Sequence, residues 1–256
     1  MVPMRAILIA IALLLAAAGG YGLKEFAAAR DSAEAPPTAS TSIDQQISQY
    51  LNDHPDEVLA ALRLAQANAE KQKEADAQLA VAEQQDQIFN NPADPVVGNV
   101  NGDVTVVEFF DYRCPYCKRV SDSLMTLVKD DPNVKVVYKE LPILGPDSLV
   151  AAKIALAAHR QGKYEQVHTA FMAHKGSFEQ ADLLDLAASV GADPAKLAVD
   201  MQDPAIQGLL QANDSLAAAL GITGTPGFLF GKQLVPGAVS LDDMKKFVSA
   251  ARAQPG

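Results

Sequence analysis

The stretch VTVVEFFDYRCPYC, residues 104–117, decides the fold of this chain. Its first seven residues are mostly apolar and rich in β-branched and aromatic side chains, which predicts a buried strand. The chain then turns into Cys114 and Cys117, with Pro-Tyr between them, and proline suits the first position of a helix. Two cysteines at this spacing, where a strand turns into a helix, indicate a thiol redox site.

Cys114 and Cys117 have different expected roles because of their places on the helix. Cys114 lies at the helix start, where unpaired backbone N–H groups and the positive end of the helix dipole favour a thiolate. We expect Cys114 to be the exposed, attacking sulfur and Cys117, one turn inward, to resolve the mixed disulfide. Two alternatives stay open. One is a static disulfide in a very short loop, and the other is a soft-metal site for Cu(I) or Zn(II).

The segments after the dithiol predict an α/β domain. Residues 134–138 form a second buried strand, and the strand–helix–strand order implies parallel pairing. From 146 to about 221 the apolar residues recur with helical spacing, which predicts four or five inserted helices. Residues 228–235 predict a hairpin, and a last helix should run from Ser240, as N-cap, to about Ala253.

The N-terminus predicts export. Residues 6–18 form an uninterrupted apolar run after Arg5, which is typical of a secretory signal, and the run extended to residue 23 borders on membrane-spanning length. We expect residues 1–23 to be a signal peptide or a membrane anchor. The protein would then be periplasmic or otherwise exported, with residues 6–23 as the anchor if the segment is retained. Residues 24–42 are expected to form a flexible linker.

Residues 43–91 predict a helical arm. Ser42 and Gln45 form a capping-box pattern, and His54-Pro55 interrupts the helix, with Asp53 as a candidate N-cap for a second one. The apolar stripe lies mainly in the first half of the arm, so it either folds back on the next domain or joins subunits. We favour a homo-oligomer through residues 43–89. An assembly role for the arm, with an inert redox domain, is a further alternative.

Charge and composition exclude several classes of protein. The 256 residues include 31 acidic and 21 basic side chains, for a formal charge of −10. Residues 32–89 hold ten acidic and three basic side chains, a net −7, so most of the acidity precedes the redox segment. An acidic balance argues against a nucleic-acid partner. Two cysteines are too few for a disulfide-stapled scaffold or a four-thiolate zinc site, and no cofactor or metal is expected.

The chain resembles the DsbA-like branch of the thioredoxin superfamily over about residues 95–253. The matching pieces are EFFDYRCPYC at 108–117, YKELPIL at 138–144, the helical insert, and GTPG at 224–227 before the returning strands. The resemblance implies a thioredoxin-like fold with an inserted helical subdomain, here preceded by the helical arm. It also implies a protein thiol-disulfide oxidoreductase or isomerase.

The resemblance implies roles for three further residues. Pro226 is expected to be cis and to pack against the dithiol, which leaves the backbone of Thr225 free to pair with an extended substrate strand. Glu108 is expected to be a buried acid that assists proton transfer at Cys117. The residues alone leave Glu108 either buried, with Lys139 as its candidate partner, or facing solvent at a sheet edge. No role is assigned to the histidines of the insert, His159, His168 and His174.

Two departures from the prototype oxidase bear on the direction of the chemistry. The dipeptide between the cysteines is Pro-Tyr rather than Pro-His, and Thr225 rather than valine precedes Pro226. Together with the arm, these features are similar to proteins of the suppressor-of-copper-sensitivity C type. That similarity implies a dithiol kept reduced by a membrane redox partner. We therefore favour isomerase or reductase activity on cysteine-containing secreted proteins over net oxidation or protective copper binding.

Overall fold

The computed structural model describes residues 42–253, which form two compact units divided between Arg63 and Leu64. The signal peptide or anchor expected at residues 1–23, and the linker expected at 24–42 except for Ser42, lie outside the described residues. Between residues 42 and 253, no helix is both long and apolar enough to cross a membrane.

The first unit contains helix α2 (Ile43–Asp53) and the start of α3 (Pro55–Glu83). Helix α2 begins as predicted, because the Ser42 hydroxyl accepts from the Gln45 N–H at 3.2 Å and the Gln45 side chain accepts from the Ser42 N–H. Asp53 does not cap the second helix. It is the last residue of α2, and α3 opens directly on Pro55.

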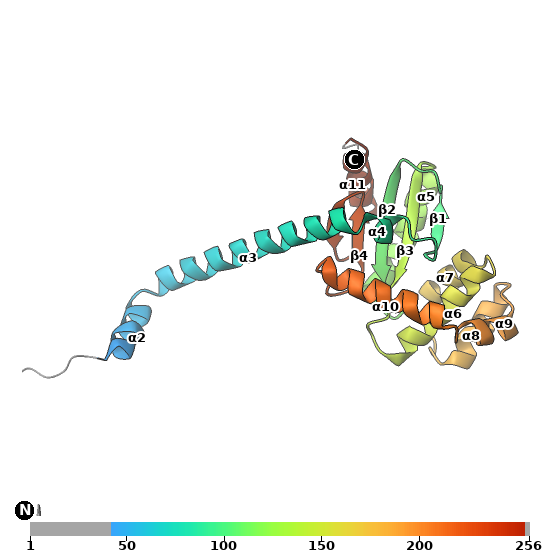
Figure 1. The fold of residues 1–256 in the computed structure, drawn as a ribbon, viewed down its shortest axis with the longest axis horizontal. Helices are drawn as coiled ribbons and strands as arrows, with labels where there is room; N and C mark the ends of the chain where they lie inside the picture. Colours follow the sequence, from blue (N-terminus) through green and yellow to red (C-terminus); the bar gives the residue numbers. More distant parts are fainter. Residues whose placement is uncertain (1–41, 254–256) are drawn as a thin grey trace, which may run out of the picture. The chain divides into compact units, whose positions relative to one another are not determined.

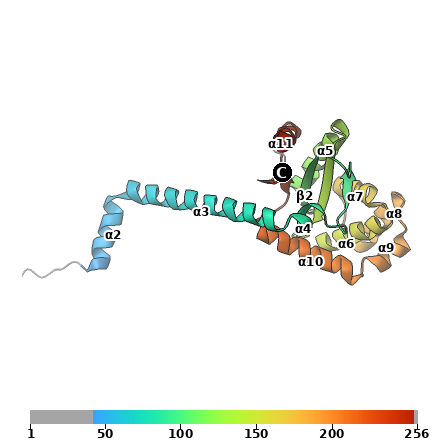
Figure 2. The ribbon, with the colours of Figure 1, turned by 45° about the horizontal axis from the view of Figure 1, so that its top comes forward.

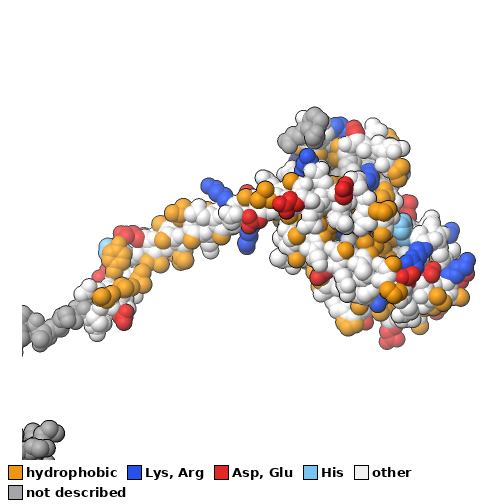
Figure 3. All heavy atoms as spheres, in the orientation of Figure 1, with side chains coloured by type: hydrophobic (Ala, Val, Ile, Leu, Met, Phe, Trp, Pro, Cys, Tyr) orange, Lys and Arg blue, Asp and Glu red, His pale blue; other side chains and the backbone are white. Residues whose placement is uncertain are grey.

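The apolar side chains of the first unit are at the surface, and Figure 3 shows them along α2 and the start of α3. Each of the larger ones is about half exposed or more: Ile43, Ile47, Tyr50, Leu51, Leu59 and Leu62.

A five-stranded sheet in the order β1-β3-β2-β4-β5 forms the centre of the second unit. Strands β2 (Val104–Phe110) and β3 (Val134–Glu140) are parallel, which confirms the prediction from their crossover helix. Strands β4 (Gly227–Phe230) and β5 (Gln233–Pro236) form the predicted antiparallel hairpin. Strand β1 (Val96–Gly98) pairs with β3 and was not predicted, because three residues carry no periodicity.

Helices cover both faces of the sheet, as Figures 1 and 2 show. Helices α5 (Pro115–Asp130) and α11 (Leu241–Ala253) pack on the face that carries Val106 and Phe110. Helix α10 (Pro204–Ala219), helix α4 (Gln85–Phe89) and the end of α3 lie on the opposite face, where Val107 and Phe109 point. Because both faces are covered, β2 and β3 are almost entirely buried, and each has one partly exposed residue.

The last turns of α3 belong to the core of the second unit. Ala80 and Val81 of α3 are buried in one cluster with Ile88 of α4 and with Val107 and Phe109 of strand β2. Packing of this unit therefore begins within α3, ahead of residue 95, where the DsbA-like segment was expected to start.

Five helices lie between residues 146 and 221, in agreement with the predicted insert. Helices α6 to α9 pack on one another beside the sheet, and α10 returns along it (Figure 1). Their bounds are Pro146–Arg160 for α6, Tyr164–Ala173 for α7, Gln180–Ser189 for α8 and Pro194–Asp200 for α9.

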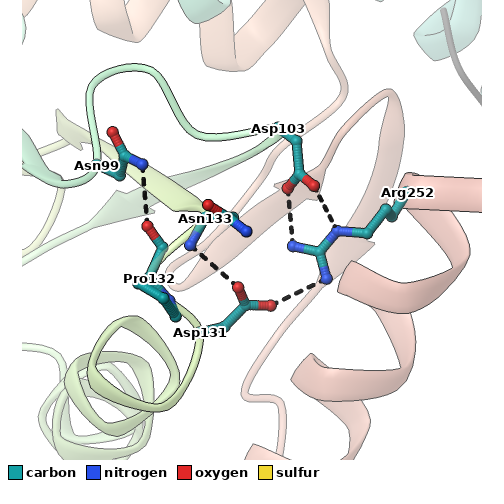
Figure 4. Close-up of polar contacts among 6 residues, drawn as sticks. All are labelled: Asn99, Asp103, Asp131, Pro132, Asn133 and Arg252. Atoms are coloured by element: carbon teal, nitrogen blue, oxygen red, sulfur yellow. Dashed lines mark hydrogen bonds and ion pairs between the residues drawn. The ribbon is translucent and has the colours of Figure 1, made fainter.

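The C-terminal helix is held at the end of the sheet where β2 and β3 begin. The guanidinium of Arg252 donates to both carboxylate oxygens of Asp103, at 2.7 and 2.8 Å, and to Asp131 at 3.0 Å (Figure 4). Helix α11 has the predicted cap, since the Ser240 hydroxyl accepts from the Asp243 N–H at 3.2 Å. The dithiol lies at the other end of β2.

Candidate active site

Cys114 and Cys117 lie where strand β2 turns into helix α5. Cys114 is the N-cap residue, Pro115 is the first helical residue, and Cys117 is in the first turn. Both cysteines are free thiols and both are buried. The expectation that Cys114 is exposed was wrong, because only 4% of this residue is accessible. The carbonyl of Thr225 covers its sulfur and accepts from it at 3.2 Å.

The loop that covers Cys114 contains the Thr225–Pro226 peptide bond, which is cis as the resemblance implies. The carbonyl of Pro226 accepts from the Gly237 N–H at 2.9 Å, which ties the loop to the end of β5. A cleft of about 240 Å³ lies along this loop and is lined by residues 221–227 and by Leu234, Pro236 and Gly237. The loop therefore places a backbone carbonyl beside the Cys114 sulfur and borders a cleft.

Glu108 is buried on the sheet face that α5 covers, so the solvent-facing alternative was wrong. Its Oε1 atom has no hydrogen-bond partner among the described residues. Burial, with a smaller contribution from the charge of Cys114, raises the pKa of Glu108 to about 8. Burial and the charge of Glu108 also raise the pKa of Cys117. The carboxyl group and the inner thiol therefore influence one another electrostatically.

Lys139 does not pair with Glu108. In the parallel register Glu108 lies beside Tyr138 and Phe109 lies beside Lys139, so the two charged side chains point to opposite faces of the sheet. That prediction was wrong because two almost entirely buried strands show no regular apolar–polar alternation from which their register could be read.

Lys139 instead forms a wholly buried ion pair with Asp94 on the opposite face of the sheet. Its ammonium group donates to the Asp94 carboxylate and to the carbonyl of Gln87 in α4. Burial raises the pKa of Asp94 to about 6 and lowers that of Lys139, while their mutual attraction opposes both shifts. This pair joins β3 to the segment that leads from α4 into β1.

A buried polar cluster on the face of Glu108 was missed by the sequence reasoning. The hydroxyls of Tyr112 and Tyr164 donate to Oε1 of Glu140 at 3.0 and 2.9 Å, and the Tyr112 hydroxyl lies 3.1 Å from His168 Nδ1. Burial lowers the pKa of His168 to about 3, so its ring is neutral near neutral pH. Helical spacing left His168 as a surface or packing residue without a role, and no signal in the sequence linked it to Tyr112 or Glu140.

The cations that follow Cys114 in the sequence are engaged with neighbouring groups. Lys118 donates to the carbonyl of His174 and lies 4.8 Å from the centroid of the Phe178 ring. Arg119 lies 4.6 Å from the centroid of the ring of Tyr116, which is itself 53% exposed beside the dithiol. The described residues contain no group of three or more His, Cys, Asp or Glu side chains that could hold a metal ion.

Residues 105–249 match the family model of the DsbA-like thioredoxin domain. Among solved structures, a thioredoxin-like oxidoreductase from Silicibacter pomeroyi is 46% identical, with a TM-score of 0.65, and the match covers 66% of this chain and 98% of that one. A linker-deletion variant of Proteus mirabilis ScsC is 27% identical, with a TM-score of 0.69, and the match covers 84% of this chain and 99% of that one.

The curated relatives include a disulfide-exchange protein and sodium/proton antiporters. The thiol:disulfide interchange protein DsbA of Bordetella parapertussis is 31% identical over 150 residues, which are 57% of this chain and 71% of that protein. The Na(+)/H(+) antiporter NhaA 1 of Salinispora arenicola is 30% identical over 170 residues, which are 63% of this chain but 26% of the antiporter. The chain thus spans about a quarter of the length of the curated relatives that it matches first. With its thioredoxin-like sheet, its helical insert and the matched residues 105–249, the chain belongs to the family of DsbA-like thioredoxin domains.

Proposed function

We propose that this protein is an exported thiol-disulfide oxidoreductase that exchanges disulfides in other exported proteins through Cys114 and Cys117. The observation that carries the proposal is the place of Cys114 in a DsbA-like domain. Its sulfur lies at the N-cap of α5, 3.2 Å from the carbonyl that precedes a cis proline. The apolar run at residues 6–18 supports export.

Disulfide exchange would proceed in two steps. The Cys114 thiolate attacks one sulfur of a substrate disulfide, which forms a mixed disulfide and releases the other substrate sulfur as a thiolate that takes up a proton. The Cys117 thiolate then attacks the Cys114 sulfur, which closes the Cys114–Cys117 disulfide and releases the second substrate thiol. Reversal of the same steps oxidises a substrate dithiol.

Glu108 is the group proposed to take the proton from Cys117. Burial raises the pKa of Cys117, so this thiol needs a base before it can attack. Glu108 shares its buried face and interacts with it electrostatically, and a carboxyl pKa of about 8 lets it exchange a proton near neutral pH. Glu108 would return the proton when the dithiol is regenerated.

Thr225 and Pro226 are proposed to bind the substrate chain. An extended segment that pairs with the backbone of Thr225 would place its own sulfur beside Cys114, and the cleft along residues 221–227 would receive neighbouring side chains. The Thr225 carbonyl already reaches the Cys114 sulfur, which supports this placement.

Isomerisation or reduction is the direction that we favour. The second residue between the cysteines is Tyr116, where the prototype oxidase has histidine. The residue before the cis proline is Thr225, where the prototype has valine. A membrane redox partner would keep the dithiol reduced. The test is a paired assay of scrambled-disulfide refolding and insulin reduction, with Cys114→Ser as the control. Equal activity of wild type and Cys114→Ser would reject the function, and net oxidation of reduced substrate without reshuffling would favour the oxidase alternative.

We further propose that residues 43–89 join subunits. The exposed apolar residues of α2 and the start of α3 support this, since a surface stripe of this kind is typical of a helix–helix contact. The test is the solution mass of the full chain with Ile47→Asp, against Val199→Asp in α9, where the replaced side chain is 72% exposed. A lower mass for Ile47→Asp alone is expected, and an unchanged mass would reject the contact.

A further inference from the structure

The loop that precedes the dithiol is fastened to the helical insert through the side chain of Asp111. This carboxylate is buried, with 2% of the residue accessible. Its Oδ1 atom accepts from the Ser148 hydroxyl in the first turn of α6 at 2.8 Å, and Oδ2 accepts from the Leu144 N–H at 3.0 Å. Oδ1 also accepts from the Arg113 N–H at 2.7 Å, which closes a turn within the loop itself. Three donors from three different positions therefore converge on one buried carboxylate.

The backbone of Asp111 is bonded to both cysteines. Its carbonyl accepts from the Cys114 N–H at 3.0 Å, and its backbone hydrogen-bonds the Cys117 thiol. A shift of Asp111 would therefore move the backbone of Cys114 and the group bonded to the Cys117 thiol together.

A second contact joins the same two segments. The Arg113 guanidinium donates to the Leu144 carbonyl at 2.9 Å and lies 3.6 Å from the Asp147 carboxylate. Gly145, which lies between Leu144 and Asp147, forms the turn with a φ of 112°. A Cβ atom at this position would lie 3.5 Å from the Arg113 guanidinium. The loop at 111–114 is thus bonded from several sides to residues 144–148.

We propose that Asp111 is a positioning residue for disulfide exchange, which orients Cys114 and Cys117 by holding their loop against residues 144–148. This inference rests on the proposed redox function. A reacting group displaced by about 1 Å can lose on the order of a hundredfold in rate, so anchoring of the loop bears directly on the chemistry. An asparagine cannot replace the carboxylate, because its amide nitrogen donates where Asp111 accepts and would leave a buried donor unsatisfied.

The test compares Asp111→Asn with Asp193→Asn in the full chain. Asp193 is a matched control, because its carboxylate also accepts from two backbone N–H groups, at 3.0 and 3.2 Å, but caps α9 and makes no contact with the dithiol loop. The readouts are the rate of exchange with a small disulfide, the equilibrium constant with glutathione and the thermal midpoint. We expect Asp111→Asn to react at least about tenfold more slowly and to shift its glutathione equilibrium. Asp193→Asn should lose thermal stability alone.

Exchange by folded Asp111→Asn within about twofold of wild type would overturn the proposal, since a purely structural role moves the thermal midpoint and leaves the chemistry unchanged. If Asp111→Asn does not fold, Ser148→Ala carries the test. It removes one donor and keeps the carboxylate, so a smaller slowing in the same direction is expected and an unchanged rate overturns the proposal. Failure of the wild-type protein to exchange disulfides would instead reject the proposed function.

Discussion

Glu108 and Lys139 occupy adjacent parallel strands one residue out of register, and their side chains lie on opposite faces of the sheet. The two buried ionisable side chains, Glu108 and Lys139, therefore lie in different surroundings. Glu108 faces the dithiol with one oxygen unpartnered, whereas Lys139 is neutralised by Asp94. The face toward α5 therefore holds a carboxyl oxygen without a hydrogen-bond partner among the described residues, and the face toward α10 holds a paired, buried cation.

Replacement of Cys117 by serine should trap the mixed disulfide. Without the resolving sulfur the first step still occurs at Cys114, and the substrate stays attached. Mass spectrometry of non-reduced protein after incubation with a disulfide substrate should show the adduct in Cys117→Ser. Its absence there, or its presence in Cys114→Ser, would contradict the assigned order of the two sulfurs.

Replacement of Glu108 by glutamine should change how stability depends on pH. The pKa of Glu108 is about 8 in the folded protein against an ordinary 4.5, so the fold binds this proton more tightly than the unfolded chain does. Its contribution to stability is fully present below about pH 4.5 and is lost as the pH rises through about 8, on the order of a few kcal/mol. Glu108→Gln should match wild type in acid and exceed it in base, as measured by thermal midpoint.

The same variant separates the two chemical steps. Glutamine cannot accept the Cys117 proton, so the release of substrate from the mixed disulfide should slow by about a hundredfold, while formation of that disulfide is spared. Rapid-quench kinetics measures both steps. Equal slowing of both would argue that Glu108 acts on the fold of the site rather than on proton transfer.

Replacement of Lys139 by methionine should be strongly destabilising. The variant leaves the Asp94 carboxylate buried without its cation, a change that costs about 3–5 kcal/mol in comparable buried pairs. Urea unfolding should show this loss, and the double variant with Asp94→Asn should recover most of it. Lys246→Met is the exposed comparison, because its pair with Asp243 lies at the surface and surface pairs contribute little. A similar loss in Lys139→Met and Lys246→Met would contradict the role given to the buried pair.

Replacement of Arg252 should lower stability without touching the chemistry. Arg252 binds Asp103 and Asp131 at the end of the sheet opposite the dithiol, and it is partly exposed, so a loss of roughly 1 kcal/mol is expected for Arg252→Ala. Arg252→Lys keeps the charge but loses the two-pronged geometry and should recover only part of the loss. A fall in the exchange rate of either folded variant would show that the two ends of β2 are coupled.

Local signals in the sequence predicted most of the fold. Strand β2, the five-helix insert, the β4–β5 hairpin and the caps Ser42 and Ser240 all follow from periodicity or from a residue type at a fixed offset. The sequence could not predict which side chains form contacts with residues far away along the chain. Nothing local relates Lys139 to Asp94, 45 positions away, or Tyr112 to His168, 56 positions away.

The candidate site divides in the same way. Cys114, Cys117 and their order along α5 follow from spacing alone, and the cis bond at Pro226 follows from the resemblance. The burial of Cys114 was missed because it depends on the Thr225 carbonyl, which reaches it from 111 residues further on. The contacts of Asp111 were not predicted, because its partners Leu144 and Ser148 lie 33 and 37 positions further along the chain.

The burial of Ala80 and Val81 against the sheet, one turn after the buried Ala77, has a consequence for the ancestry of this protein. A redox domain moved by recombination with a junction at residue 91 or 95 would lack the helical turns that cover Val107 and Phe109. Its sheet would then expose an apolar surface to water. Successful gene fusions should therefore carry the end of α3 along with the redox domain, and their junctions should fall before Ala77.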